Sequence, residues 1–195
     1  MMKDAAEWDD ALVLLGEVLE NRRATPCHLV VCGGAALRAT EFVTRVTKDV
    51  DVLAFRGEVD GEIGAAWPLP EDLLKAVAEV AVELGLPATW LNASTWLLIG
   101  PLERLPAEVW SELREINYGP CLTISYVGRA GQIPLKMCAA LDRREPRDLD
   151  DLRALAPTAE ECRRAVLWIR QAGLPDAGWQ SRLDEILEFL GHASN

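Results

Sequence analysis

Two aspartates separated by one residue are the side chains of this sequence that best suit metal chemistry. Asp49 and Asp51 open the run 49–55 (DVDVLAF), whose alternation of polar and apolar residues predicts a β-strand. Because successive side chains on a strand point to opposite faces, both carboxylates are expected on one face, with Val50 and Val52 directed into the core. Such a pair can share Mg²⁺, which typically takes one or two carboxylates together with substrate phosphates. The alternative is a solvated pair of acids at the start of an edge strand.

A pair of glycines comes shortly before the aspartates. Gly33 and Gly34 follow the apolar run 28–32 (HLVVC), which predicts a buried strand, and precede residues 35–42, which predict a short helix. Glycine adopts positive φ and lets a ligand approach the backbone, and a helix start offers unpaired N–H groups to a phosphate. Taken alone, two glycines after a strand more often form an ordinary turn than a phosphate-binding loop. The whole succession, from strand through glycines and helix to the acid pair, suits phosphoryl or nucleotidyl transfer.

A second group of charged residues lies in the C-terminal third of the chain. Lys136 stands among apolar residues of a predicted helix, so its ammonium group reaches either the surface or a cleft. In the helix predicted over 147–155, Arg147 and Asp151 are four residues apart, which predicts an ion pair on one face. Asp148 and Asp151 also stand near the start of that helix, where acids stabilise the helix dipole. A structural role at the helix start therefore explains Asp148 and Asp151 no less well than a catalytic role does.

Taken together, the two groups resemble the polymerase-β-type nucleotidyltransferase superfamily. More narrowly, they resemble the AbiEii-type and related bacterial nucleotidyltransferase-like proteins, which include toxins of type IV toxin–antitoxin systems. The first motif consists of Gly33, Gly34, Arg45, Thr47, Lys48, Asp49 and Asp51. The second consists of P-L-K-M-x-A at 134–139, Arg143 with Arg144, and R-D-x-x-D-L at 147–152. The resemblance covers roughly residues 28–155.

The resemblance implies a set of site residues. Mg²⁺ is assigned to Asp49 and Asp51, and the triphosphate to the two glycines. Lys136 is expected to contact phosphate, and Asp148 or Asp151 to complete or support the site. The nucleotide-binding segment as a whole is expected to comprise Gly33, Gly34, Arg45, Thr47 and Lys48.

The implied activity is transfer of a nucleoside monophosphate from an NTP to an acceptor hydroxyl. RNA, a protein side chain and a small molecule remain open as acceptors. The alternative is a non-catalytic or antitoxin-regulated nucleotide-binding relative, that is, a toxin–antitoxin component with a cognate antitoxin as its partner. A purely structural α/β domain is the third interpretation.

The sequence departs from the superfamily pattern at one point. Many members place a third carboxylate on a later strand that faces the first two. The strand predicted at 121–127 (CLTISYV) carries hydroxyl groups at Thr123, Ser125 and Tyr126 but no acid. Three outcomes are open: a single metal binds, activity is lost, or a carboxylate from elsewhere completes the site, the candidates being Glu41, Asp148 and Asp151.

Charge and hydropathy restrict the class of protein. The 195 residues include 20 Lys and Arg against 31 Asp and Glu, a net charge of −11. This charge disfavours a broad nucleic-acid surface, because affinity there depends on neutralising phosphates, although basic residues gather at 38–48 and 129–147. No stretch reaches the roughly 18 apolar residues of a membrane span, and the acidic N-terminus lacks the basic start of a signal peptide. We therefore expect a cytoplasmic protein with no membrane partner.

The cysteines and tryptophans are expected mainly to pack. Five scattered cysteines without CxxC spacing favour reduced, mostly buried thiols over a zinc site or a disulfide frame. Three tryptophans of the middle region are core or lid residues, unless one of them stacks on a base: Trp90, Trp96 and Trp110.

The remaining patterns predict an α/β (α+β) fold with a small mixed sheet flanked by helices and a helical C-terminal third. We expect a core with an N-terminal helix at 1–130 and a helical part packed on it at 131–195. Residues 56–70 read as a loop, and 86–106 mostly as loop. Apolar periodicity predicts helices at 4–23, 71–84, 107–116, 132–143, 147–155, 158–172 and 179–191.

Overall fold

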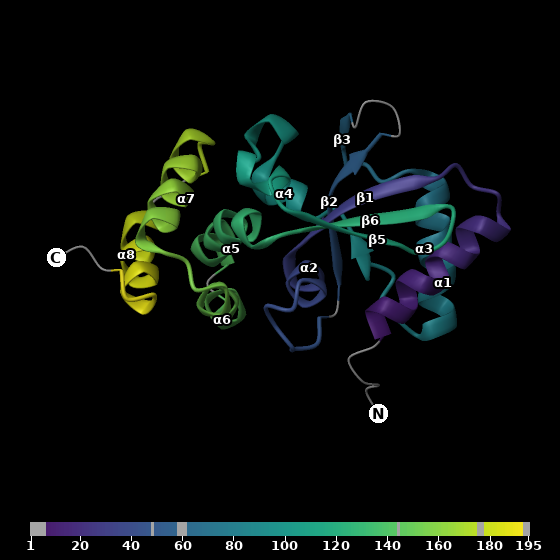
Figure 1. Cartoon of the computed structure of the whole chain (residues 1–195), viewed down its shortest axis with the longest axis horizontal. Coiled ribbons are helices and arrows are strands. Elements are labelled where there is room, and N and C mark those ends of the chain that lie inside the picture. The colour runs from purple at the N-terminus through teal and green to yellow at the C-terminus, as the bar shows by residue number, and fades with distance from the viewer. Residues whose placement is uncertain (1–6, 48, 58–61, 144, 175–177, 193–195) are drawn as a thin grey trace.

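Six strands form one mixed sheet in the described part of the chain, in the order β3-β2-β1-β6-β5, with β4 paired to β2 beside this path. Helices pack around the sheet, and the C-terminal third is helical and lies at one end of the molecule (Figure 1). The predicted α+β class, with a small mixed sheet and a helical C-terminal third, is confirmed. The computed structural model describes residues 7–47, 49–57, 62–143, 145–174 and 178–192.

Strand β1 lies at the centre of the sheet and has neighbours of both orientations. It is antiparallel to β2 and parallel to β6, and β5 is antiparallel to β6. Short β4 pairs in parallel with the first residues of β2. Parallel neighbours need a crossover connection. Between β1 and β6 this connection comprises residues 33–121, which include β2 to β5 and helices α2 to α4. The strands are β1 Cys27–Cys32, β2 Val50–Arg56, β3 Ile63–Ala65, β4 Leu91–Asn92, β5 Leu113–Asn117 and β6 Leu122–Val127.

Helices α1 (Glu7–Asn21) and α3 (Glu71–Leu84) cover one face of the sheet with their apolar sides. The predicted bounds of α3 are confirmed, and Gly85 ends this helix with a φ of 65°. Val50 and Val52 are buried in the same core, as the alternation in β2 predicts. The period of two therefore directs the intervening Asp51 to the opposite face.

The opposite face is covered by α4 (Thr95–Ile99), by a 3₁₀ turn η2 (Ala107–Trp110) and by α5 (Arg129–Arg143). Side chains of these elements share a second core with Val30 and Val127 of the sheet. Between α4 and α5, this core leaves open the end of β1 and the start of β2, where Asp51 lies.

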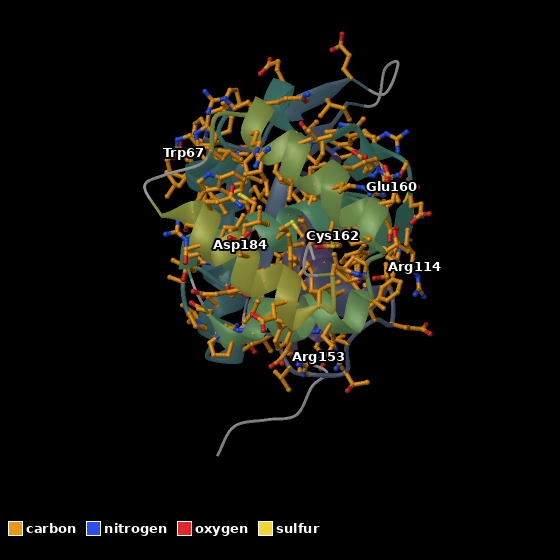
Figure 2. All side chains as sticks on the ribbon, turned by 90° about the vertical axis from the view of Figure 1, so that its left-hand side faces the viewer. Trp67, Arg114, Arg153, Glu160, Cys162 and Asp184 are labelled. Atoms are coloured by element: carbon orange, nitrogen blue, oxygen red, sulfur yellow. The ribbon has the colours of Figure 1, made fainter. Side chains whose placement is uncertain are left out.

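The C-terminal helices pack against α5 and one another around a third core. Figure 2 looks onto this end, where α7 and α8 lie side by side and Cys162 of α7 points into the core that they share. A capping box between Thr158 and Glu161 fixes the start of α7. These helices are α6 Pro146–Leu155, α7 Ala159–Gln171 and α8 Trp179–Phe189.

The helix predicted at 107–116 is wrong. Only one 3₁₀ turn forms, at η2, and the chain then enters β5, which pairs with β6. The backbone of Glu112 accepts a hydrogen bond of 2.7 Å from Gly128 at the end of this ladder. Leu, Glu and Arg favour helices intrinsically, but that preference is weak, and pairing with a strand distant in sequence overrides it.

Smaller differences concern boundaries. The predicted loop 56–70 contains β3, and 86–106 contains β4, α4 and a 3₁₀ turn η1 (Leu102–Arg104). The helix predicted at 35–42 is α2 (Gly33–Ala39), which begins at the glycines and ends earlier. Strand β2 begins at Val50, so Asp49 directly precedes it.

The expected packing of cysteines and of one tryptophan is confirmed. All five thiols are free, four of them buried and Cys27 partly buried. Trp90 is buried, and its indole Nε1 donates a 3.1 Å hydrogen bond to the carbonyl of Val77. Within the described residues, no helix has the length and apolar character that crossing a membrane requires.

Candidate functional site

Asp51 lies where β1 runs into α2. The register pairs Cys32 of β1 with Asp51 of β2, so the carboxylate lies beside the first residue of the helix. The sequence predicts the two glycines as a connection between the strand and a helix that begins at residue 35. In the structure no separate turn follows β1, because α2 begins at Gly33, which changes the chain direction with a φ of 72°. A Cβ atom at Gly33 would lie 2.7 Å from Asp51 Oδ2. Glycine is therefore required here both by the backbone angle and by the approach of the carboxylate.

A pocket opens beside this carboxylate, between α4 and α5. Its polar lining comes from Asp51, Ser94, Gln132, Lys136 and Arg143, and its apolar wall from the neighbouring turns of the two helices. Gly33 belongs to the same lining. Two broader hollows of the described surface, beside α7, are lined by other residues. The pocket at the end of β1 thus gathers members of both sequence motifs.

The carboxyl group of Asp51 is electrostatically unfavourable in its ionised form. Burial raises its pKa to about 6, and the negative charge of Asp49 acts in the same direction. The positive charges of Lys136 and Arg143, and a 3.5 Å hydrogen bond from Ser94, lower the pKa but do not cancel this effect. Perturbed acids in pockets of this kind are typical of functional sites.

Asp49 lies half-buried just before β2, where Thr47 Oγ1 donates to its carboxylate over 3.3 Å. It acts on Asp51 across the buried Val50, so the spacing of two brings the charges into interaction as predicted. Within the described residues, no group of three or more His, Cys, Asp or Glu side chains is arranged to hold a metal. Two carboxylates with substrate oxygens nevertheless fit Mg²⁺, so the metal assignment stays a prediction.

Lys136 faces this pocket, and it is fully engaged by acids of α6. Its Nζ lies 3.0 Å from Asp148 Oδ1 and 2.7 Å from Asp151 Oδ2. Arg45 also binds Asp151 in a bidentate fashion, with hydrogen bonds of 2.9 and 2.6 Å. Burial alone would raise the pKa of Asp151, but the hydrogen bonds from Arg45 and Lys136 lower it. These four side chains form what we call the ion network, which ties the first motif to the second.

The ion pair predicted between Arg147 and Asp151 is wrong. Arg147 pairs with Glu145 at 3.3 Å on the exposed side of α6, whereas Asp151 is buried and its oxygens face Arg45 and Lys136. Spacing of four residues places two side chains on one helix face. The buried partners on other elements compete more strongly, because an unpaired charge there would be costly.

Three residues expected at the nucleotide pack against one another. A Cβ atom at Gly34 would lie 2.6 Å from Thr47 Oγ1 and 3.4 Å from Arg45 Nη2. The absence of a side chain at Gly34 therefore lets Thr47 and Arg45, which precede β2, pack closely against α2. Arg45 also fixes this segment to Asp151 of α6. None of the three is among the described residues that line the pocket, so their nucleotide contacts stay predictions. Lys48 lies outside the described residues.

Asp51 has β1 on one side and, on the other, β4, which lies in a region predicted mostly as loop. On the β4 side Asp51 pairs with Asn92, whereas the predicted strand 121–127, now β6, is separated from β2 by β1. The position facing Asp51 on this side therefore carries an amide instead of an acid. Asn92 Oδ1 accepts a 2.8 Å hydrogen bond from the backbone of Ser94 and shapes the turn into α4. The polar run Asn-Ala-Ser-Thr at 92–95 is the sequence feature from which the turn between β4 and α4 could have been predicted.

The proposed substitutes for the third acid lie elsewhere. Glu41 is exposed and pairs with Arg114 at 3.4 Å, and Asp148 and Asp151 belong to the ion network. Gln132 was also overlooked: it is fully buried, its Oε1 accepts from the backbone of Gly33, and its Nε2 donates to the carbonyl of Val127, both at 3.3 Å. The first N–H group of α2, expected to face phosphate, is therefore already bonded.

Comparisons with protein-family models, with curated proteins and with solved structures find no match to this chain. The resemblance to nucleotidyltransferases therefore rests on the two motifs, and the functional argument rests on the geometry of the pocket.

Proposed function

We propose that this protein binds a complex of Mg²⁺ and a nucleoside triphosphate in the pocket beside Asp51 and transfers the nucleoside monophosphate to an acceptor hydroxyl. The observation that carries the proposal is the half-buried, unfavourable charge of Asp51 beside Gly33, with Asp49 adding a second negative charge. The pocket cations form their ion pairs with acids of α6 instead. A divalent cation is the kind of ligand that relieves such repulsion.

Each wall of the pocket has a defined part in this proposal. Asp51 in the pocket wall, together with Asp49 just before β2, would hold the cation once ionised, and the hydrogen bond from Ser94 orients the Asp51 carboxylate. The positive charges on α5 attract the phosphate chain, and apolar residues of α4 and α5 exclude water from it. Bound Mg²⁺ supplies Lewis-acid stabilisation of charge on the transferred phosphoryl group.

A non-catalytic or partner-regulated nucleotide-binding protein is the second candidate. The observation that favours it is Asn92, because an amide at the position facing Asp51 cannot accept a proton from an acceptor hydroxyl. In this alternative the two aspartates still hold Mg²⁺ and nucleotide, but no transfer follows.

Membership of the polymerase-β-type superfamily is part of the same proposal, with the AbiEii-type toxin–antitoxin relatives as the nearest group. The motifs at Gly33, Asp49, Asp51 and Lys136 support it. A cytoplasmic location fits the free, mostly buried thiols. A cognate antitoxin would then be the partner that regulates the pocket.

The decisive experiment incubates the purified protein with each α-labelled NTP, Mg²⁺ and total RNA. Transfer of label to RNA or to the protein itself, lost in Asp51→Asn, supports the enzyme. Nucleotide binding without transfer supports the second candidate. If the protein neither binds nor transfers any of the four nucleotides, both candidates fail and a structural α/β domain remains.

A further inference from the structure

The two cations that line the pocket differ in how firmly the protein holds them. The Lys136 side chain is 9% exposed and lies between two buried carboxylates at 3.0 and 2.7 Å. The Arg143 side chain is 51% exposed, and its nearest carboxylate oxygens, both from Asp148, lie 3.4 Å away. Contacts of that length on an exposed side chain are weak. Arg143 is therefore the cation that is free to rearrange.

The charges of the ion network balance without Arg143. Asp148 and Asp151 carry two negative charges, and Lys136 and Arg45 carry two positive charges that contact them at 2.6 to 3.0 Å. A move of Lys136 toward a ligand would leave Asp151 with Arg45 alone and the buried Asp148 with only the long contacts of Arg143, so one buried negative charge would lose its close cation, which is strongly unfavourable. A move of Arg143 would break only its long contacts with Asp148.

On the basis of the proposed function, we propose that Arg143 is the residue that binds the triphosphate, and that Lys136 is a positioning residue that holds α5 and α6 in place. Arg143 lines the pocket that contains Asp51, and its charge acts on the Asp51 carboxyl. A guanidinium group donates two parallel hydrogen bonds to one phosphate. This assignment transfers to Arg143 the phosphate contact that the resemblance gives to Lys136.

Phosphate affinity of the full-length protein tests this assignment. The probes are inorganic tripolyphosphate in EDTA and, with Mg²⁺, an NTP and its NMP, each titrated by calorimetry. Arg143→Gln is expected to lose about tenfold or more in affinity for tripolyphosphate and NTP, because hydrogen bonds to a charged group are lost. Arg143→Lys, which keeps the charge but not the paired donors, is expected to bind with intermediate affinity.

Arg147→Gln is the matched control, because it removes the same charge from the exposed side of α6, outside the pocket lining. It is expected to change affinity by less than about twofold, as an exposed pair contributes little. The preference for NTP over NMP should disappear in Arg143→Gln and persist in Arg147→Gln. Melting temperatures of both variants should stay near that of the parent.

The outcomes separate this inference from the proposed function. Parent-like affinity for tripolyphosphate and NTP in either Arg143 variant overturns the role of Arg143 but leaves the function standing, provided that Asp51→Asn abolishes Mg²⁺-dependent binding. Equal losses in Arg143→Gln and Arg147→Gln overturn it as well, because they indicate a general field effect. If the parent binds no triphosphate, with or without Mg²⁺, the function and this inference fail together.

Discussion

Two groups of aspartates differ in how the protein treats their charges. In the ion network, Asp148 and Asp151 meet Lys136 and Arg45 at short distances, so their charges are compensated by the fold. At the start of β2, Asp51 is half-buried near a second acid, and its pKa rises to about 6. Compensated acids hold elements together, whereas an acid left unfavourable in a pocket is available to a ligand.

The largest expected effect comes from breaking the compensated group. Lys136→Met leaves two buried carboxylates without their shared cation, so the free energy of unfolding should fall by about 3–5 kcal/mol. Urea denaturation at neutral pH measures the change. Lys75→Met, which removes an exposed lysine paired with Glu71 on α3, is the control and should change the free energy of unfolding far less. Equal stability of Lys136→Met and the parent would show that the network carries no compensation.

The next largest loss of stability is expected from a substitution at Gly33, which lies against Asp51. Gly33→Ala adds both left-handed backbone strain and a clash with Asp51 Oδ2 at 2.7 Å. Gly85→Ala adds strain alone, since its φ is 65° and no atom lies within 4 Å of the new Cβ. We expect about 1–2 kcal/mol of destabilisation for Gly85→Ala and clearly more for Gly33→Ala by thermal unfolding. Equal losses would mean that Asp51 moves away without cost.

Removing the charge of Asp51 should stabilise the protein in a pH-dependent way. The folded pKa of about 6 lies above the ordinary value of 3.8, so ionisation penalises the folded state fully above pH 6. The penalty shrinks between pH 6 and 4 and vanishes below the unfolded pKa. Asp51→Asn should therefore raise the free energy of unfolding by up to about 3 kcal/mol at pH 8 and leave it unchanged near pH 3.5. Destabilisation by Asp51→Asn at pH 8 would contradict the unfavourable charge.

The smallest expected effect is stabilisation by ligand. At about ten times its dissociation constant, a complex of Mg²⁺ and NTP stabilises the folded state by about 1.4 kcal/mol, a rise of roughly 3–5 °C in melting temperature. Metal alone should do little, since two carboxylates leave most of its coordination to the triphosphate. The double variant Asp49→Asn with Asp51→Asn should abolish the rise. If the melting curve of the parent stays unchanged with Mg²⁺ and each of the four NTPs, Asp49 and Asp51 do not bind this ligand.

The candidate site could be predicted in part from its local spacing. The alternation in 49–55 correctly directs Val50 and Val52 into the core, and Gly33 after β1 does lie beside Asp51. The residue pattern left Lys136 either at the surface or in a cleft and only the resemblance placed it at the site; in the structure Lys136 lines the same pocket. What the spacing did not show is that Lys136 is already occupied by Asp148 and Asp151.

The sequence by itself determined the elements whose local signals, that is, apolar periodicity, intrinsic propensity and terminating residues, all favour the same structure. Helix α3 has matching apolar periodicity and a terminating glycine, and β1 and β6 are short apolar runs rich in β-branched residues. Tertiary structure alone decided that Asp151 binds Arg45, 106 residues away, that Asn92 faces Asp51, and that residues 113–117 form a strand. The physical reason is that these choices are competitions between partners on different elements. Local propensities are weaker than the cost of an unpaired buried charge or an unpaired strand edge.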